Sequence, residues 1–122
     1  MDWLGDNAKH RIVQELVPGK QITLAHIIAS PDEILYKKLG LDPAVEYSKA
    51  AIGILTLSPA ETAIIAGDIS IKASGAQLGF VDRFSGTVIL TGTYSEVEAS
   101  LVAVTEYAEQ TLGFTVCKIT KT

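Results

Sequence analysis

The sequence predicts an α+β domain of the ferredoxin-like type. From residue 51 onward, strand and helix patterns follow one another as strand, helix, strand, strand, helix, strand, which is the split βαβ order. The helix starts also share one signature, and glycines follow their ends. We expect an antiparallel sheet that carries both main helices on one face. An extra hairpin over residues 10–28 and an extra helix over 31–39 precede this unit.

Composition limits the function classes. The chain has 122 residues, 48% of them hydrophobic and 20% charged, which is typical of one folded domain and not of a disordered chain. The net charge is −4 and the basic residues are scattered, so we expect no nucleic-acid partner. No apolar run approaches the roughly 20 residues that cross a bilayer, and Met1–Asp6 does not resemble a secretory signal. The single cysteine, Cys117, fits a reducing cytoplasm.

Three helices are predicted from their starts and ends. Each begins with a capping box, in which a serine hydroxyl and a glutamate carboxylate accept hydrogen bonds from free backbone N–H groups. Two of the boxes carry a proline that we place at the first helical position. A glycine closes each helix. The boxes are Ser30–Glu33, Ser58–Glu61 and Ser95–Glu98, the prolines are Pro31 and Pro59, and the glycines are Gly40, Gly75 and Gly113.

The two main helices differ in their predicted buried faces. The second helix presents small residues among its apolar positions, which would let it lie close to the sheet, and Asp68 and Lys72 are spaced for an ion pair. The third helix has an ordinary aliphatic stripe. The expected faces are Ala60, Ala63, Ile64, Gly67 and Ile71 on the second helix, and Val97, Leu101, Val104, Ala108 and Leu112 on the third.

Strand patterns fill the remaining segments. Residues 51–57 form an apolar run typical of a central strand, and residues 77–84 and 87–91 are expected to form a hairpin. Residues 114–119 alternate more weakly. Upstream, Ile22, Leu24, His26 and Ile28 are expected on one face of a strand over residues 21–28, and a weaker strand precedes it at 10–17. Residues 1–9 are interpreted as a flexible tail, and residues 10–122 as one domain.

Residues that usually carry chemistry are few and dispersed. His10 and His26 stand alone, and no phosphate-binding or metal-ligand spacing is present. A Cys117–His26 nucleophile pair is conceivable, but Cys117 is better explained as a small buried hydrophobe and His26 as a hydrogen-bonded core or interface residue. We therefore predict no catalytic residue, no metal site and no cofactor.

The loop between residues 80 and 87 carries an unusual set of side chains. It brings an arginine, a phenylalanine and a serine to the tip of the predicted hairpin. Composition alone favours a simple tight turn in which Asp82 pairs with Arg83 or with solvent. A functional loop is the other interpretation.

These residues resemble a known family. Gly79–Gly86 followed by Val88–Gly92 is similar to the pore-loop hairpin of bacterial microcompartment (BMC) shell proteins, whose flat hexamers tile into a shell. In ordinary members a strand and a helix close the chain, whereas here the matching stretch, Leu24–Pro31 and its helix, comes first. That order resembles the circularly permuted branch of ethanolamine and propanediol utilisation. Val13–His26, Ile52–Thr56 and Ile119–Thr122 add to the resemblance, which covers about residues 10–122.

The resemblance implies roles for particular residues. Six copies would surround an axis, with the turn of Arg83, Phe84, Ser85 and Gly86 forming the pore loop. Lys72 matches a lysine at the edge between hexamers. The usual Pro-Arg-Pro motif at that edge is replaced by Ala29-Ser30-Pro31, which would fit a bent or symmetry-broken tile. One strand from each copy would build a six-stranded β-barrel that caps the pore, formed by Arg11, Ile12, Val13, Gln14, Glu15, Leu16 and Val17.

The leading hypothesis is therefore a non-enzymatic shell subunit in the bacterial cytoplasm. It would form a homohexamer and contact other shell proteins and enclosed enzymes, with no nucleic-acid or membrane partner. A small ferredoxin-like regulatory domain that binds a ligand in a discrete oligomer is the alternative, because a fold does not fix a function. An enzyme using Cys117 and His26 is the weakest reading. Ethanolamine, propanediol and choline pathways all remain open.

Overall fold

The computed structural model describes residues 19–45, 47 and 50–122. Its elements follow the predicted order, while the proposed tail at 1–9 and strand at 10–17 lie outside the described residues. The elements are β1 (Gln21–Ile28), α2 (Ile34–Lys38), β2 (Ala51–Ser58), α3 (Thr62–Ala73), β3 (Gln77–Asp82), β4 (Thr87–Gly92), α4 (Tyr94–Gln110), β5 (Thr115–Val116) and β6 (Thr120–Lys121).

The sheet is mixed rather than purely antiparallel as predicted. Its described strands are ordered β3-β4-β2-β1-β5, and β6 also pairs with β1. The four longer strands are antiparallel neighbours, whereas β5 and β6 run parallel to β1. The single strand predicted over residues 114–119 is wrong. Two short strands form instead, because Cys117 and Ile119 between them pack partly buried against the core.

Strand β1 contains an irregularity that the sequence pattern did not indicate. Its register against β2 shifts between Ile22 and Leu24, so one residue is added to the strand. A bulge of this kind reverses the alternation of side chains after it. Ile22 therefore shares the buried face with Ala25 and Ile27, which are both fully buried. The prediction that Ile22, Leu24, His26 and Ile28 share one face was wrong at its first position.

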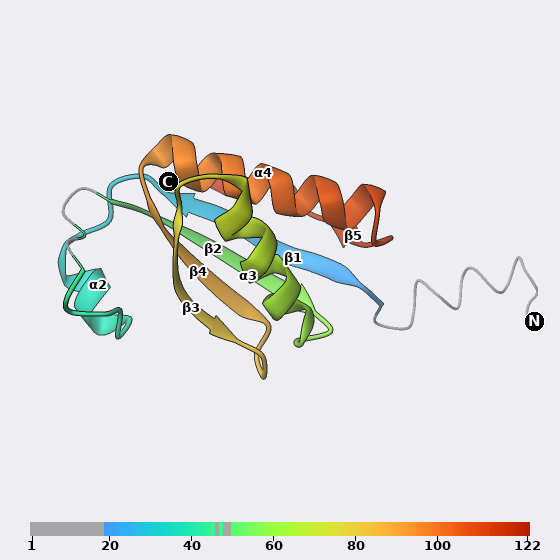
Figure 1. Cartoon of the computed structure of the whole chain (residues 1–122), viewed down its shortest axis with the longest axis horizontal. Helices are drawn as coiled ribbons and strands as arrows, with labels where there is room; N and C mark the ends of the chain where they lie inside the picture. Colours follow the sequence, from blue (N-terminus) through green and yellow to red (C-terminus); the bar gives the residue numbers. More distant parts are fainter. Residues whose placement is uncertain (1–18, 46, 48–49) are drawn as a thin grey trace, which may run out of the picture.

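Helices α3 and α4 cover the same face of the sheet, as predicted (Figure 1). The main core lies between them and the strands. The predicted stripe of α4 is buried at Val97, Leu101, Val104 and Ala108, and Leu112 packs partly buried against the same core. On the other face of the sheet, Tyr36 and Leu41 from the α2 region pack on strand residues in a second, smaller cluster.

The buried face of α3 differs from the prediction. Ala63, Ala66, Gly67 and Ser70 face the core. By contrast, Ile64 and Ile71, which were expected there, are 54% and 45% exposed. Small residues do allow close approach, because a Cβ on Gly67 would lie 3.1 Å from Val81 Cγ2. The larger aliphatic side chains of this helix are left outside.

The three predicted capping boxes are wrong, although α4 does begin with a capping box of other residues. The box of α4 uses Thr93 and Glu96, two residues before the predicted Ser95–Glu98. Glu96 N donates to Thr93 Oγ1 over 3.1 Å, and Thr93 N donates to Glu96 Oε1 over 2.9 Å. Helices α2 and α3 have no side-chain cap, and α3 ends on Ser74 in an extended conformation.

The prolines also sit elsewhere than predicted. Pro31 and Pro59 precede their helices by a turn, and the Pro59 carbonyl accepts a hydrogen bond from Thr62 N. These starts are tight turns, so the side-chain box was not needed there.

Within the described part of the chain, no helix has the length and apolar content to span a membrane.

Candidate functional site: the β3–β4 turn and the α3–β3 groove

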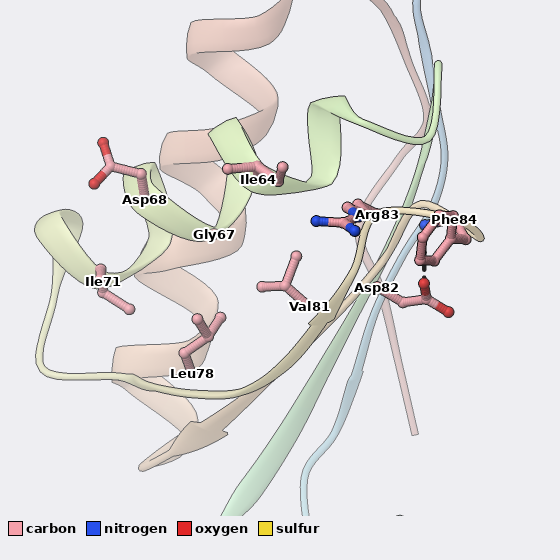
Figure 2. Close-up of a pocket in the computed structure, with 9 residues that line it drawn as sticks. All are labelled: Ile64, Gly67, Asp68, Ile71, Leu78, Val81, Asp82, Arg83 and Phe84. Carbon is pink, nitrogen blue, oxygen red and sulfur yellow. Dashed lines mark hydrogen bonds between the residues drawn. The ribbon is translucent and has the colours of Figure 1, made fainter.

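Asp82 holds the β3–β4 turn in shape. Its Oδ1 accepts a hydrogen bond from Phe84 N, and its Oδ2 accepts one from the Ser85 hydroxyl, both over 2.9 Å (Figure 2 draws the first). Gly86 N also donates to the Asp82 carbonyl over 2.8 Å. The Phe84 N–H is the main cause that holds the pKa of Asp82 below its ordinary value, and the Ser85 hydroxyl adds to it. The carboxylate therefore holds the backbone of the turn, and it does not simply pair with Arg83 or solvent.

Gly86 anchors the turn to the sheet. Its carbonyl accepts a hydrogen bond from Leu57 N over 2.8 Å. Its φ is +79°, in the left-handed region that side chains disfavour, and a Cβ there would collide with the Leu57 carbonyl oxygen. The position thus requires glycine on two independent grounds, and the tip of the hairpin is fixed against β2.

Arg83 and Phe84 project from this rigid turn. Phe84 is 81% exposed, the most exposed of the large hydrophobic side chains in the described residues. The Arg83 guanidinium carbon lies 4.9 Å from the centre of the Phe84 ring, within the range of a cation–π contact. The turn therefore presents an apolar ring and a cation side by side at the tip of the hairpin.

A groove beside the turn was missed by the sequence analysis. It has a volume of about 600 Å³ and runs between α3 and β3 (Figure 2). Ile64 and Ile71 from α3 and Leu78 from β3 line it, and each is at least 40% exposed. The signal that could have found it is the presence of large aliphatic residues on more than one side of the second helix.

Lys72 lies in the last turn of α3, and Asp68 lies one turn before it. Lys72 Nζ is 2.9 Å from Asp68 Oδ2, which confirms the predicted pair. Both side chains are more than half exposed, so water screens the pair and it contributes little to folding. The predicted barrel strand, Arg11, Ile12, Val13, Gln14, Glu15, Leu16 and Val17, lies outside the described residues.

The histidine and the cysteine have structural surroundings. His26 Nδ1 lies 2.6 Å from Thr120 Oγ1, and its Nε2 lies 3.0 Å from Thr122 Oγ1, so the ring bridges β1 to the C-terminal segment. This confirms the hydrogen-bonded histidine. Cys117 is partly buried against the main core. Across the described residues, no group of three or more His, Cys, Asp or Glu side chains could hold a metal ion.

The chain matches curated proteins over most of its length. It is 53% identical to the bacterial microcompartment shell protein PduU of Salmonella typhimurium, over 92% of this chain and 93% of PduU. It is 50% identical to the shell protein EutS of the same organism, over 93% of this chain and 97% of EutS. Residues 51–120 match the BMC domain family.

Solved structures agree with these matches. A structure described as a CutR flat hexamer superposes with a TM-score of 0.79 at 48% identity, over 87% of this chain and 94% of the other. A CutR screw form with a pitch of 41.9 Å superposes with a TM-score of 0.78 at 48% identity, over 86% of this chain and all of the other. The chain therefore belongs to the BMC-domain shell proteins of PduU, EutS and CutR type.

Proposed function

We propose that this chain is a structural subunit of a bacterial microcompartment shell, without enzymatic activity, that works as a ring of six copies. The observation that carries this proposal is the match to the CutR flat hexamer at 48% identity and a TM-score of 0.79. Identity near 50% over more than nine tenths of the chain to two named shell proteins supports it. The shell surrounds enzymes in the bacterial cytoplasm, so other shell proteins and enclosed enzymes are the proposed partners.

In this ring, the β3–β4 turn lines the central opening. Arg83, Phe84, Ser85 and Gly86 then contribute six copies of an exposed cation, an aromatic ring and a hydroxyl around the axis. The rigidity of the turn supports this role, because a pore keeps its size only if its lining is fixed. Lys72 lies at the outer rim in the same proposal, facing the next hexamer.

The strand formed by Arg11–Val17 closes the opening from one side in the proposed assembly. Six such strands, one from each copy, would pair into a β-barrel. The physical support is that a strand with no partner in its own chain is an aggregation hazard, and closing a barrel removes its free edges. Residues 1–9 lie before this strand as a tail outside the shell domain of residues 10–122.

The ring is also proposed to tolerate departures from flat sixfold symmetry. CutR occurs both as a flat hexamer and as a screw, so a contact of this type can repeat with more than one geometry. A head-to-tail contact closes into a ring when its rotation divides a full turn and otherwise gives a helix. The Ala29-Ser30-Pro31 sequence, in place of Pro-Arg-Pro, is consistent with that freedom.

Native mass spectrometry of the full chain tests the proposal. We expect a species of about six times the 13.0 kDa subunit at micromolar concentration. A stable monomer would refute the ring. A smaller discrete oligomer that binds a metabolite saturably would support the regulatory-domain alternative instead.

Deletion of residues 1–17 tests the barrel separately. We expect the hexamer to persist while the axis opens in class averages from electron microscopy, because the barrel caps the ring and does not build it. Loss of folding or of the hexamer on deletion would show that the segment is part of the ring.

A further inference from the structure

A group of three serines joins the end of α3 to the first turns of α4. Ser70 of α3 and Ser100 of α4 are both fully buried, and Ser74 is the residue that follows the last turn of α3. The two helices lie on the same face of the sheet (Figure 1), and the serines connect them where α3 ends. Burying a hydroxyl group costs free energy unless it is hydrogen-bonded, so the partners of these serines explain their position.

The hydrogen bonds of this group cross between the helices at two points. Ser100 Oγ donates to the Ser70 carbonyl over 2.6 Å. Ser74 Oγ donates to the Glu96 carbonyl over 2.8 Å and accepts from Ala76 N over 3.0 Å. The hydroxyl oxygens of Ser74 and Ser100 lie 2.9 Å apart, so the two crossing points form one connected network.

These contacts do the work of a helix cap. The last four carbonyl groups of a helix have no partner within it, and Ser70 is the first of those four in α3. Ser74 is extended, so the helix does not end in the left-handed residue that commonly closes one. The next residue is also fixed, because a Cβ on Gly75 would collide with the Glu96 carboxylate. The last turn of α3 is therefore held by α4.

Lys72 lies midway between the two anchored positions. Ser70 precedes it by two residues and Ser74 follows it by two, while its side chain points outward and is 74% exposed. The ion pair with Asp68 is also exposed, so it holds the ammonium group only weakly. The place of the Lys72 ammonium group on the surface is thus set by the backbone of the last turn, and that backbone is set by α4.

We propose that Ser100 is a positioning residue for Lys72. It holds the last turn of α3 so that each subunit presents its lysine in the same direction to the next hexamer. The inference rests on the proposed function, which puts Lys72 at the outer rim, and it adds the residue on another helix that fixes this contact. Because the rim contact repeats at every junction of a sheet, a small change in its direction accumulates over many hexamers.

A matched pair of substitutions separates this role from simple stabilisation. Ser100→Ala removes the hydroxyl that bonds to α3. Thr105→Val removes another buried hydroxyl of α4, but one that donates to the Leu101 carbonyl of its own helix over 3.0 Å. Each variant loses one buried hydrogen bond, so we expect modest and similar losses of thermal stability. Only Ser100→Ala releases the end of α3.

Amide hydrogen exchange of the full chain measures the release directly. Exchange reports local opening, and mass spectrometry of a peptide over residues 69–76 isolates the last turn of α3. We expect exchange there to be at least tenfold faster in Ser100→Ala than in the wild type or in Thr105→Val, with no change in the first turn of α3. Equal exchange in all three proteins would refute the hold of Ser100 on the turn.

Assembly of hexamers into sheets or tubes, seen by electron microscopy, tests the link to Lys72. We expect Ser100→Ala to raise the concentration needed for assembly at least threefold, and Thr105→Val to leave it unchanged. In a Lys72→Ala background, Ser100→Ala should have no further effect, because the group that it positions is gone. A further loss of the same size would show that Ser100 acts through general stability and would overturn the proposal.

The outcomes also separate this inference from the proposed function. If Lys72→Ala assembles as the wild type does, the rim position of Lys72 is wrong, whatever Ser100 does to the turn. If Lys72→Ala is impaired but Ser100→Ala loosens the turn and still assembles normally, only the present inference is wrong. Circular dichroism checks folding. Ser74→Ala, at a partly buried position, removes the second crossing bond and should reproduce both effects even if Ser100→Ala does not fold.

Discussion

At Gly53 of β2 the sheet packs closely against α4. A Cβ added there would lie 2.6 Å from Val97 Cγ1, whereas carbon atoms in contact are normally about 3.5–4.0 Å apart. Val97 is fully buried, so its side chain cannot turn aside into solvent. Gly53→Ala must therefore push helix and sheet apart by about 1 Å, and overpacking of this kind costs about 1–3 kcal/mol.

The same geometry predicts that a second substitution relieves the first. Val97→Ala alone leaves a cavity and should cost about 2 kcal/mol. In the double variant, the methyl group at position 53 occupies part of the space that the valine vacates. We expect the double variant to be about 1–2 kcal/mol more stable than the sum of the single effects predicts.

The assay is urea unfolding of the wild type, both single variants and the double variant. All four are measured at one subunit concentration, because assembly makes the stability of an oligomer depend on concentration. Effects that add to within about 0.5 kcal/mol would show that the two positions do not touch. That result would contradict the packing of α4 on β2.

Three further predictions concern the cap, the rim and the turn. Thr93→Ala should lower stability by about 1 kcal/mol, and Ser95→Ala by less than half of that, in thermal unfolding; the reverse order would place the capping box at Ser95. Lys72→Ala should leave the hexamer and its stability unchanged, because the ion pair of Lys72 with Asp68 is exposed. It should reduce the assembly of sheets or tubes seen by electron microscopy, because Lys72 is proposed to face the next hexamer. A broken hexamer would place Lys72 inside the ring contact. The folded pKa of Asp82 is lowered, so its ionised carboxylate stabilises the turn above the unfolded pKa of about 4, and this is lost as pH falls through the folded value. Carboxyl ¹³C titration of Asp82 should therefore give a midpoint below that of an unstructured peptide, and an equal or higher midpoint would contradict the hydrogen bonds of the turn.

Local patterns predicted the order of the elements well, because helix periodicity and strand alternation depend only on residues that are close together in the sequence. The bulge in β1 was not predictable in this way. Ile22, Leu24, His26 and Ile28 alternate without interruption in the sequence, and only pairing with β2 shows the added residue. Likewise, nothing local specifies that Thr120 and Lys121 pair in parallel with β1, since that contact joins residues far apart in the chain.

The capping box of α4 shows how tertiary contacts choose between equal local signals. Thr93–Glu96 and Ser95–Glu98 both have the spacing of a capping box. The structure uses the first pair, where the Glu96 side chain also packs at Gly75 and Gly92. Both glycines leave room for this carboxylate, and they come from the ends of α3 and β4. The choice is therefore made by the packing of three elements and not by the helix start alone.

Helix α3 carries apolar side chains on its exposed part as well as toward the sheet. A helix that packs on one side only should be polar on its opposite face. Here the buried side consists of Ala63, Ala66, Gly67 and Ser70, while isoleucines lie on the exposed part of the helix. The small residues bring the helix close to its own sheet. A Cβ on Gly67 would already lie 3.1 Å from Val81 Cγ2, so larger side chains do not fit on that side and the isoleucines lie on the other.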